Sequence, residues 1–214
     1  MFSPTAGAVA FSGGIADNGV LVLRDSIVDD NRVSAIAPSG TANPTSGGIG
    51  IVQKATISNT RVTGNEVSAK TTSGVAIAEA GGIQTTETTL SNSLISDNRL
   101  TASSQTGTAS VHGAGLQHGN GLLDIRNTTI SNNTANAAGP TGEALGGGIW
   151  NDVFFPPPPN PQLTLENTTI IDNALTASTG ITVHGGGLFT TFPVALHHST
   201  IRHNTPDECF GQSC

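Results

Sequence analysis

The sequence is built from a two-part repeat that recurs six times along its 214 residues. The first part is a Gly-Gly-aliphatic unit, as at Gly13-Gly14-Ile15, with the variant Gly113-Ala114-Gly115-Leu116 in the fourth copy. The aliphatic anchors are Ile15, Ile49, Ile83, Leu116, Ile149 and Leu188, at intervals of 34, 34, 33, 33 and 39 residues. Self-similarity at a period of roughly 20 to 50 residues is typical of solenoids and other repeat arrays. The chain is therefore expected to fold by stacking similar units.

The second part of the repeat is a polar stretch with Ile or Val three residues before an Asn. Its copies end at Asn31, Asn65, Asn98, Asn133, Asn173 and Asn204. Alternating aliphatic residues precede it, as at Leu21 and Leu23, and a period of two is typical of strands with one buried face. Each repeat is predicted to hold roughly three short strands. A loop rich in Ala, Ser, Thr and Gly then follows, as over 35–46, 69–80 and 135–144.

One repeat cannot bury its few aliphatic side chains, whereas stacked repeats bury a continuous column of them. The sequence therefore predicts an all-β parallel β-helix of about six coils, each of 33 to 39 residues, with loops leaving at one corner. The recurring Asn is expected at a sharp turn, in a left-handed backbone conformation, with its amide stacked on the next Asn. A β-propeller or a β-sandwich is the alternative, but the aromatic blade signatures of a propeller are missing and the regular Asn column favours the β-helix.

The predicted repeats occupy residues 1–204, and residues 205–214 form a Cys-containing C-terminal cap. The coils are placed at about 13–46, 47–80, 81–112, 113–145, 146–184 and 185–204. Cys209 and Cys214 are spaced for a small disulfide loop, while free thiols and metal binding stay open alternatives. A disulfide would favour an oxidising compartment. Residues 8–11 run straight into the first Gly-Gly unit, so an uncapped strand edge is expected there, with end-to-end self-association as its consequence.

Charge and hydropathy narrow the classes of partner. The chain carries 8 Lys and Arg against 15 Asp and Glu, for a net charge of −7, and it has no basic run. Nucleic acid is therefore not an expected partner. No stretch approaches the roughly 20 apolar residues that a membrane-spanning helix needs. Residues 1–5 show no basic region followed by an apolar core, so no signal peptide is visible in the chain.

The unit Gly146-Gly147-Gly148-Ile149, followed by Asn167-Thr168-Thr169-Ile170 and Asn173, resembles the right-handed β-helix repeats of the pectate-lyase-like superfamily. It is also similar to polymorphic outer-membrane-protein repeats, although Ile or Val here replaces the aromatic residue of their aromatic-x-x-Asn motif. The resemblance implies a right-handed coil and a secreted or cell-surface bacterial protein. It leaves function open, because this fold serves lyases, hydrolases, adhesins and passenger domains alike.

A candidate ligand surface follows from the residue after each aliphatic anchor, which should point outward. These residues are Ala16, Gly50, Gln84, Gln117, Trp150 and Phe189. Gln117, Trp150 and Phe189 lie on adjacent predicted coils, where flat rings and an amide suit contact with sugars. The alternative, which is favoured, is that both aromatic rings pack beneath the proline-rich loop at 154–161.

Catalytic candidates are weaker. Glu79 and His112 occupy the same position in successive coils, and His118 lies two residues past its anchor, so the three residues suggest an acid–base or metal site. The ordinary interpretation, surface or stacking histidines beside glycine turns, is favoured, and no metal site is assigned. Glycoside hydrolysis normally needs two flanking acids, and the nearest other acid, Asp152, has no obvious partner.

The sequence thus favours a non-enzymatic extracellular or cell-surface module that acts as a scaffold, an adhesin-like surface or a glycan contact. Its expected partner is a polysaccharide or a cell-surface glycan, and no cofactor is expected. The alternative is a polysaccharide lyase or glycoside hydrolase acting in a groove along one sheet, for which Ca²⁺ would be the implied ion. A third interpretation is a fragment of a longer repeat protein without activity of its own.

Overall fold

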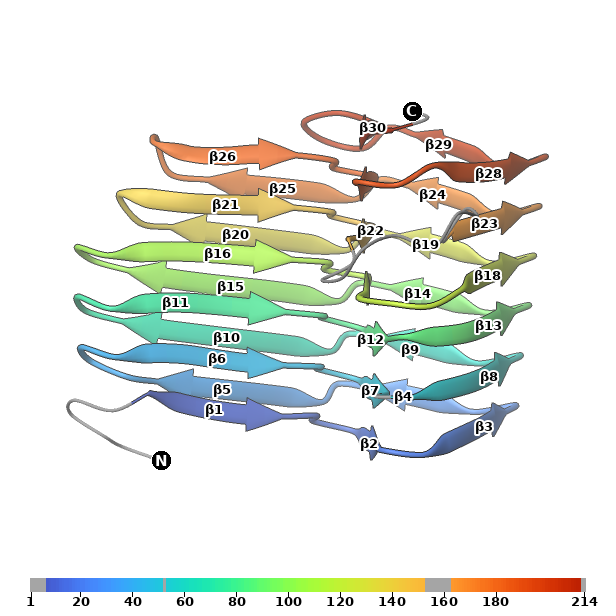
Figure 1. Ribbon diagram of the computed structural model, residues 1–214, viewed down its shortest axis with the longest axis horizontal. Helices are drawn as coiled ribbons and strands as arrows, with labels where there is room; N and C mark the ends of the chain where they lie inside the picture. The colour runs from blue at the N-terminus through green and yellow to red at the C-terminus, as the bar shows by residue number, and fades with distance from the viewer. Residues whose placement is uncertain (1–6, 52, 153–162, 213–214) are drawn as a thin grey trace.

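A computed structural model describes residues 7–51, 53–152 and 163–212. The chain winds into a parallel β-solenoid in which five strands make one turn, and each strand pairs in parallel with its equivalents in neighbouring turns (Figure 1). Five turns are complete, from β1 to β25, and the strands β26 to β29 and β30 follow in a sixth. In Figure 1 the front strands run from left to right as the chain climbs, which is the right-handed sense.

The strands form five sheets, named here A to E. Sheet A contains β1 (Ala8–Phe11), β6 (Thr41–Thr45), β11 (Val75–Glu79), β16 (Thr108–His112), β21 (Thr141–Leu145) and β26 (Ile181–His184). Sheet B contains β2 (Ile15–Asp17), β7 (Ile49–Ile51), β12 (Ile83–Thr85), β17 (Leu116–His118), β22 (Ile149–Asn151), β27 (Leu188–Thr190) and β30 (Cys209–Gly211). Sheet C contains β3 (Val20–Arg24), β8 (Lys54–Ser58), β13 (Glu87–Ser91), β18 (Leu123–Arg126), β23 (Leu163–Glu166) and β28 (Val194–His197). Sheet D contains β4 (Ile27–Asp29), β9 (Arg61–Thr63), β14 (Leu94–Ser96), β19 (Thr129–Ser131), β24 (Thr169–Ile171) and β29 (Thr200–Arg202). Sheet E contains β5 (Arg32–Ile36), β10 (Glu66–Thr71), β15 (Arg99–Ser104), β20 (Thr134–Ala138) and β25 (Ala174–Ala177).

Sheets B, C and D enclose a wide lobe with an aliphatic core. The predicted anchors pair in register along sheet B, as Ile49 with Ile83 and Ile83 with Leu116, so they form one continuous column. Ile57 of sheet C and Ile95 of sheet D pack into the same core, and both are fully buried. This column confirms that the repeat stacks its aliphatic residues, as the sequence predicts.

Sheets A and E lie face to face and form a narrow lobe whose core is mainly alanine (Figure 1). Ala76 and Ala109 of sheet A and Ala69 and Ala102 of sheet E are almost fully buried. The prediction of loops over 35–46, 69–80 and 135–144 is therefore wrong, since strands of these two sheets occupy most of each segment. The prediction of three strands per repeat is wrong for the same reason. Alanine is small enough to let two sheets approach closely, so its alternation with polar residues encodes strands here.

The Asn residues of the repeat form a ladder between the two lobes. Each Nδ2 donates to the Oδ1 of the next Asn at 2.9 Å, from Asn31 through to Asn204. The predicted stacking of Asn amides is thus confirmed. The Gly-Gly unit faces this ladder, and a Cβ atom on Gly82 would lie 2.9 Å from Nδ2 of Asn98. The Gly-Gly unit and the Asn of each repeat therefore pack against each other at the narrow waist between the two lobes, which explains why both recur together in the sequence.

The ladder Asn residues do not themselves adopt the left-handed backbone, which corrects the sequence-based expectation. The residue before each one does, as at Asp97 (φ 59°) and Asn132 (φ 56°). A second left-handed column, which includes Asn59, Asn92 and Asn127, marks the corner between sheets C and D. The residue before each ladder Asn therefore makes the turn, and the Asn itself makes the amide hydrogen bonds.

The two ends of the solenoid differ. At the C-terminal end, β30 adds to sheet B, and Glu208 accepts hydrogen bonds from the backbone N and Nδ2 of Asn204 at 3.1 and 2.8 Å. The ladder thus ends on a carboxylate. At the N-terminal end, β1 to β5 are the edge strands of their sheets. Cys214 lies outside the described residues, so its pairing with Cys209 stays a prediction, as does association through the N-terminal end. In the described ranges no helix is long and apolar enough to cross a membrane.

Candidate functional site

Two hollows open on the outer face of sheet B near the N-terminal half of the solenoid. One, of about 290 Å³, is lined by Phe11, Gln84, Gln117 and Asn120 among others. The other, of about 380 Å³, is lined by Phe11, Gln84, Gly50 and neighbouring residues. Because both include Phe11 and Gln84, they form one trough that runs across successive turns, named here the axial groove.

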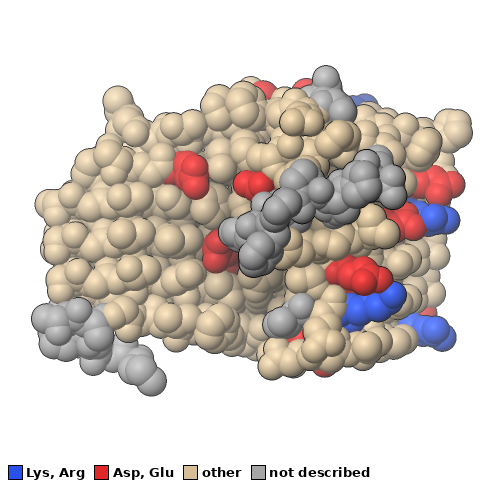
Figure 2. Space-filling view, in the orientation of Figure 1, with Lys and Arg blue, Asp and Glu red and all other residues tan. Residues whose placement is uncertain are grey.

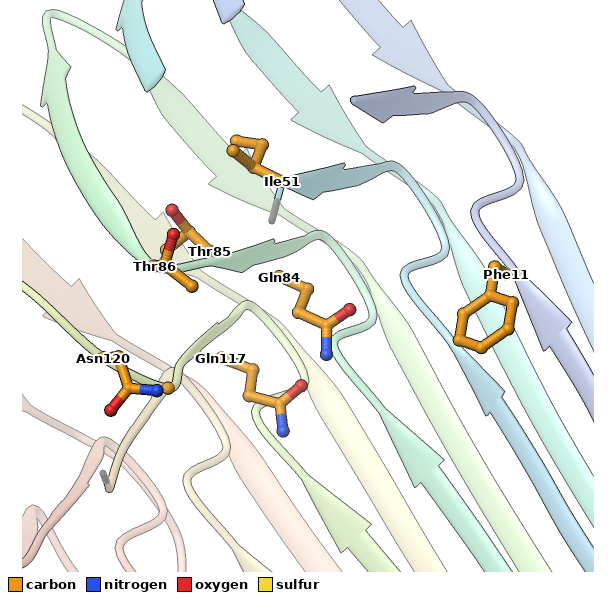
Figure 3. Close-up of a pocket in the computed structure, with 8 residues that line it drawn as sticks. Phe11, Ile51, Gln84, Thr85, Thr86, Gln117 and Asn120 are labelled. Atoms are coloured by element: carbon orange, nitrogen blue, oxygen red, sulfur yellow. The ribbon is translucent and has the colours of Figure 1, made fainter. Parts of the chain in front are cut away.

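The axial groove exists because the outward column of sheet B changes size along the solenoid. Its members pair in register as Ala16, Gly50, Gln84, Gln117, Trp150 and Phe189. The small residues of the first two turns leave space, and Phe11, which is 72% exposed, borders it. Figure 3 shows Gln84 and Gln117 extending to the same side of their strands, whereas Ile51 and Thr85 point to the other side.

Two members of the predicted sugar-binding strip are covered by packing. Gln117 is 2% exposed and Trp150 is 5% exposed. The Trp150 ring stacks on His112 with centroids 5.2 Å apart, and Phe189 stacks on Phe210 at 5.8 Å. Trp150 therefore packs against sheet A, while the loop at 154–161 lies outside the described residues. A ligand role for Gln117, Trp150 and Phe189 stays a prediction, and among them Gln117 lines the groove.

A charged cluster lies beside the groove where sheet A meets sheet B. His112 Nε2 lies 2.9 Å from Oε1 of Glu143, and His112 Nδ1 lies 3.5 Å from Oε1 of Glu79. Glu79 also accepts a hydrogen bond of 3.2 Å from Nε2 of Gln117. The predicted proximity of Glu79 and His112 is thus confirmed, and strand pairing places them side by side. The three residues Glu79, His112 and Glu143 are called the Glu–His–Glu cluster below.

The charges within the cluster support one another. Burial by itself lowers the pKa of His112, but the hydrogen bond to Glu143 and the close carboxyl groups of Glu143 and Glu79 outweigh it, so the pKa is raised to about 9. The hydrogen bond from His112 correspondingly lowers the pKa of Glu143, against the opposing effect of burial. At neutral pH His112 is therefore an imidazolium, and it lies between the side chains of Glu79 and Glu143.

His118 does not join this cluster, so the predicted grouping of Glu79, His112 and His118 is wrong. Its side chain is fully buried, and Nδ1 lies 2.6 Å from Oδ1 of Asn151, whose Nδ2 donates to Thr190 at 2.9 Å. Burial lowers the pKa of His118. The cause is strand alternation, because residues 117 and 118 face opposite sides of sheet B. Within the described ranges, no group of three His, Cys, Asp or Glu residues is arranged to hold a metal ion.

Asp152 lies apart from both features. It accepts a hydrogen bond of 2.6 Å from Oγ1 of Thr191 in the neighbouring turn. A catalytic role for Asp152 stays a prediction. Its side chain is hydrogen-bonded to Thr191 and not to a second acid.

The charge distribution on this side of the molecule is uneven. In Figure 2 Lys and Arg gather at the right-hand end, over sheet C, where Lys54 pairs with Glu87 at 2.5 Å and Arg126 pairs with Asp124 at 2.7 Å. Asp and Glu are spread along the middle of the same face. Lys54, whose partner Glu87 follows the groove-lining Thr86, is therefore a basic residue beside the groove with its charge compensated by an acid.

Sequence reasoning missed two residues of this region. Glu143 falls in a segment that was predicted to be a loop, and its equivalents in the adjacent turns are Ser110 and Thr182, so no column of acids marks it. Phe11 precedes the first anchor by four residues, where the next turns carry Thr45 and Glu79, so an aromatic wall had no repeat signal.

Comparisons with protein families, with curated proteins and with solved structures gave no match. The fold and the site therefore define a class by geometry alone: a parallel β-solenoid with an axial groove on its outer face, bordered by a Glu–His–Glu cluster.

Proposed function

We propose that this chain is a non-enzymatic β-solenoid module that contacts saccharides through the axial groove, in an extracellular or cell-surface setting. The observation that carries the proposal is the groove itself, a trough lined by the amides of Gln84, Gln117 and Asn120 and bordered by the exposed ring of Phe11. Saccharides combine apolar C–H faces with many hydroxyl groups. Aromatic rings and amides are the complementary chemistry.

The direction of the groove fits an extended ligand. Its lining residues come from successive turns of sheets A and B, and neighbouring strands of a sheet are spaced by about 4.8 Å. A trough that crosses several turns therefore suits a chain of sugars lying along the solenoid better than a compact molecule. A rigid sheet also holds the lining residues in place before a ligand arrives, which reduces the entropy cost of binding.

The resemblance of the repeat to pectate-lyase-like β-helices supports a polysaccharide partner and a location outside the cell. Assignment to that superfamily is part of the proposal. The lining favours binding over catalysis, since among the described lining residues Asp17 is the one that carries a carboxyl group. Hydrolysis of a glycosidic bond normally uses two such groups.

The test is a screen of the purified chain against a polysaccharide panel, with and without Ca²⁺, that follows unsaturated products, reducing ends and binding on a glycan array. We expect binding without turnover. Phe11→Ala should weaken binding several-fold, whereas Leu196→Ala, which removes another exposed side chain on sheet C, should leave it unchanged. Turnover of any substrate would replace the proposal with the lyase or hydrolase alternative. Silence in every assay would leave a scaffold without a glycan ligand.

A further inference from the structure

We infer that Gln117 Oε1 is a built acceptor for a hydroxyl group of a neutral saccharide, and that the Glu–His–Glu cluster fixes its orientation. This inference deepens the proposed function and rests on it.

The orientation of the Gln117 amide is set by chemistry. Its Nε2 donates to Glu79 Oε1 at 3.2 Å, and an ionised carboxylate only accepts hydrogen bonds. A reversed amide would place two acceptors against each other, so Oε1 of Gln117 must be the free end. That oxygen is buried and has no hydrogen-bond partner in the described part of the chain, although Gln117 lines the groove. A buried acceptor without a donor is unfavourable, so a ligand donor would satisfy it.

The Glu–His–Glu cluster holds this arrangement in place. His112 is hydrogen-bonded through Nε2 to Glu143 at 2.9 Å, and its Nδ1 forms an ion-pair contact of 3.5 Å with Glu79. The His112 ring is additionally stacked on Trp150. Glu79 is thereby held in position, so it continues to accept the hydrogen bond from Nε2 of Gln117. The cluster acts through Gln117 and contributes no atom to the groove lining, so its members are positioning residues.

Gln84 supplies the complementary donor. Its Oε1 accepts a hydrogen bond of 2.8 Å from Oγ of Ser46, which leaves its Nε2 to face the groove. In Figure 3 this nitrogen is turned toward the Gln117 amide. A hydroxyl group both donates and accepts, so it can bridge Gln117 Oε1 and Gln84 Nε2, whereas a carboxylate would meet Oε1 without a proton to donate.

The net charge of the Glu–His–Glu cluster also favours a neutral saccharide as the ligand. Two carboxylates and one imidazolium leave one negative charge beside the groove. Lys54 lies next to the groove lining on sheet C, and its charge is compensated by the ion pair with Glu87 at 2.5 Å. Uronate chains would therefore be repelled, and neutral chains would not.

The test measures binding of the full chain to neutral cello-, xylo- and mannohexaose and to hexagalacturonate by titration calorimetry. We expect at least one neutral probe to bind and hexagalacturonate to bind at least tenfold more weakly. Gln117→Leu should weaken the neutral probe roughly tenfold, the effect of losing one hydrogen bond to a buried acceptor. Because Gln117 is buried, Gln84→Leu is a second variant, at a half-buried site, with the same expected direction. Gln105→Leu, an exposed Gln in another part of the surface, is the matched control.

The variant Glu79→Gln distinguishes a role of Glu79 in orienting the Gln117 amide from a role in stabilising the fold alone. Its amide can donate as well as accept, so Gln117 can reverse, and one negative charge is lost. The neutral probe should bind more weakly while hexagalacturonate binds more tightly, and a general loss of structure would weaken both. Neutral binding that Gln117→Leu and Gln84→Leu leave unchanged would overturn this inference while the proposed function stands. Preferred binding of hexagalacturonate would overturn the ligand class, and absence of binding by every probe would overturn the proposed function as well.

Discussion

The two lobes of the solenoid are built from the same number of turns but from opposite kinds of side chain. The wide lobe fills its core with Ile, Leu and Val, such as Ile57 and Ile95, whereas the narrow lobe fills its core mainly with alanine, such as Ala76 and Ala102. A fully buried Ile or Leu contributes about 1.5 to 3 kcal/mol, and a single methyl group less than about 1 kcal/mol. The narrow lobe therefore depends more on its strand ladders and on close contact between sheets A and E.

The comparison teaches that a repeat need not be aliphatic to be a strand. Two sheets that meet through alanine bury little area per residue, but their strands are hydrogen-bonded through the parallel ladders between turns. The wide lobe can then vary in loop length, while the narrow lobe is constrained in side-chain size at each buried position.

The largest expected effects come from exchanging side-chain size between the lobes. Ile95→Ala should destabilise the protein by about 3 to 5 kcal/mol, because it leaves a cavity in a fully buried site. Ala102→Leu should destabilise it by about 1 to 3 kcal/mol or more, because the larger side chain forces the two sheets apart. Urea unfolding followed by circular dichroism measures both. A stable Ala102→Leu variant would show that the narrow lobe is loosely packed and would contradict the comparison.

The waist between the lobes gives the next effect. Asn98→Ala removes the acceptor for Asn65 and the donor to Val62 O and Asn133, all in buried surroundings, so a loss of about 2 to 4 kcal/mol is expected. Asn92→Ala is the control, since Asn92 is exposed at a corner and its left-handed backbone should cost about 1 kcal/mol. Equal losses of unfolding free energy in the two variants would mean that the buried hydrogen bonds of the Asn ladder add no stability beyond that of an exposed corner Asn.

The outer junction of the lobes is expected to respond to pH. His112 on sheet A has a pKa of about 9 in the folded protein against 6.5 ordinarily, so the folded state binds this proton more tightly. The stabilisation is present below about pH 6.5 and is lost as the pH rises through 9, with a total of about 3 kcal/mol from the two pKa values. Urea midpoints from pH 6 to 10 measure it, and His112→Gln should flatten the profile.

His198→Gln is the matched control for this pH dependence, because His198 is exposed at a corner. Its profile should follow that of the unaltered protein. A wild-type profile without a fall above pH 7 would contradict the ion pairs that connect His112 to Glu79 and Glu143.

The strands of the wide lobe could be predicted from the sequence, whereas those of the narrow lobe could not, and the reason is physical. Alternation of Leu and Ile with polar residues is a strong signal, whereas alternation of Ala with Ser and Thr, as at Thr101-Ala102-Ser103, has the composition of a loop. The stacking of Asn residues was predictable because they recur. The relation of Glu79 to His112 was predictable from spacing, but Glu143 was not, because it occurs once. Strand alternation also placed His118 inside, which the spacing alone did not reveal.

The smallest expected effect on stability concerns the first described turn, where β1 to β5 are the edge strands of their sheets. Val20 and Ile27 of the first turn are 70% and 66% exposed, and the residues paired with them in the second turn are Lys54 and Arg61. The first turn thus carries apolar side chains where the second carries charges, and an exposed edge with apolar residues favours pairing between copies.

We expect sedimentation velocity to show concentration-dependent association of the unaltered chain. The double variant Val20→Lys, Ile27→Arg carries the charged residues of the second turn, so it should sediment as a monomer. Its free energy of unfolding should lie within about 0.5 kcal/mol of that of the unaltered protein. Leu196→Lys, a similar change at an exposed site on the last turn of sheet C, should not alter association. If the parent stays monomeric at every concentration, the apolar first turn does not pair copies, and the difference between the two ends is one of exposure alone.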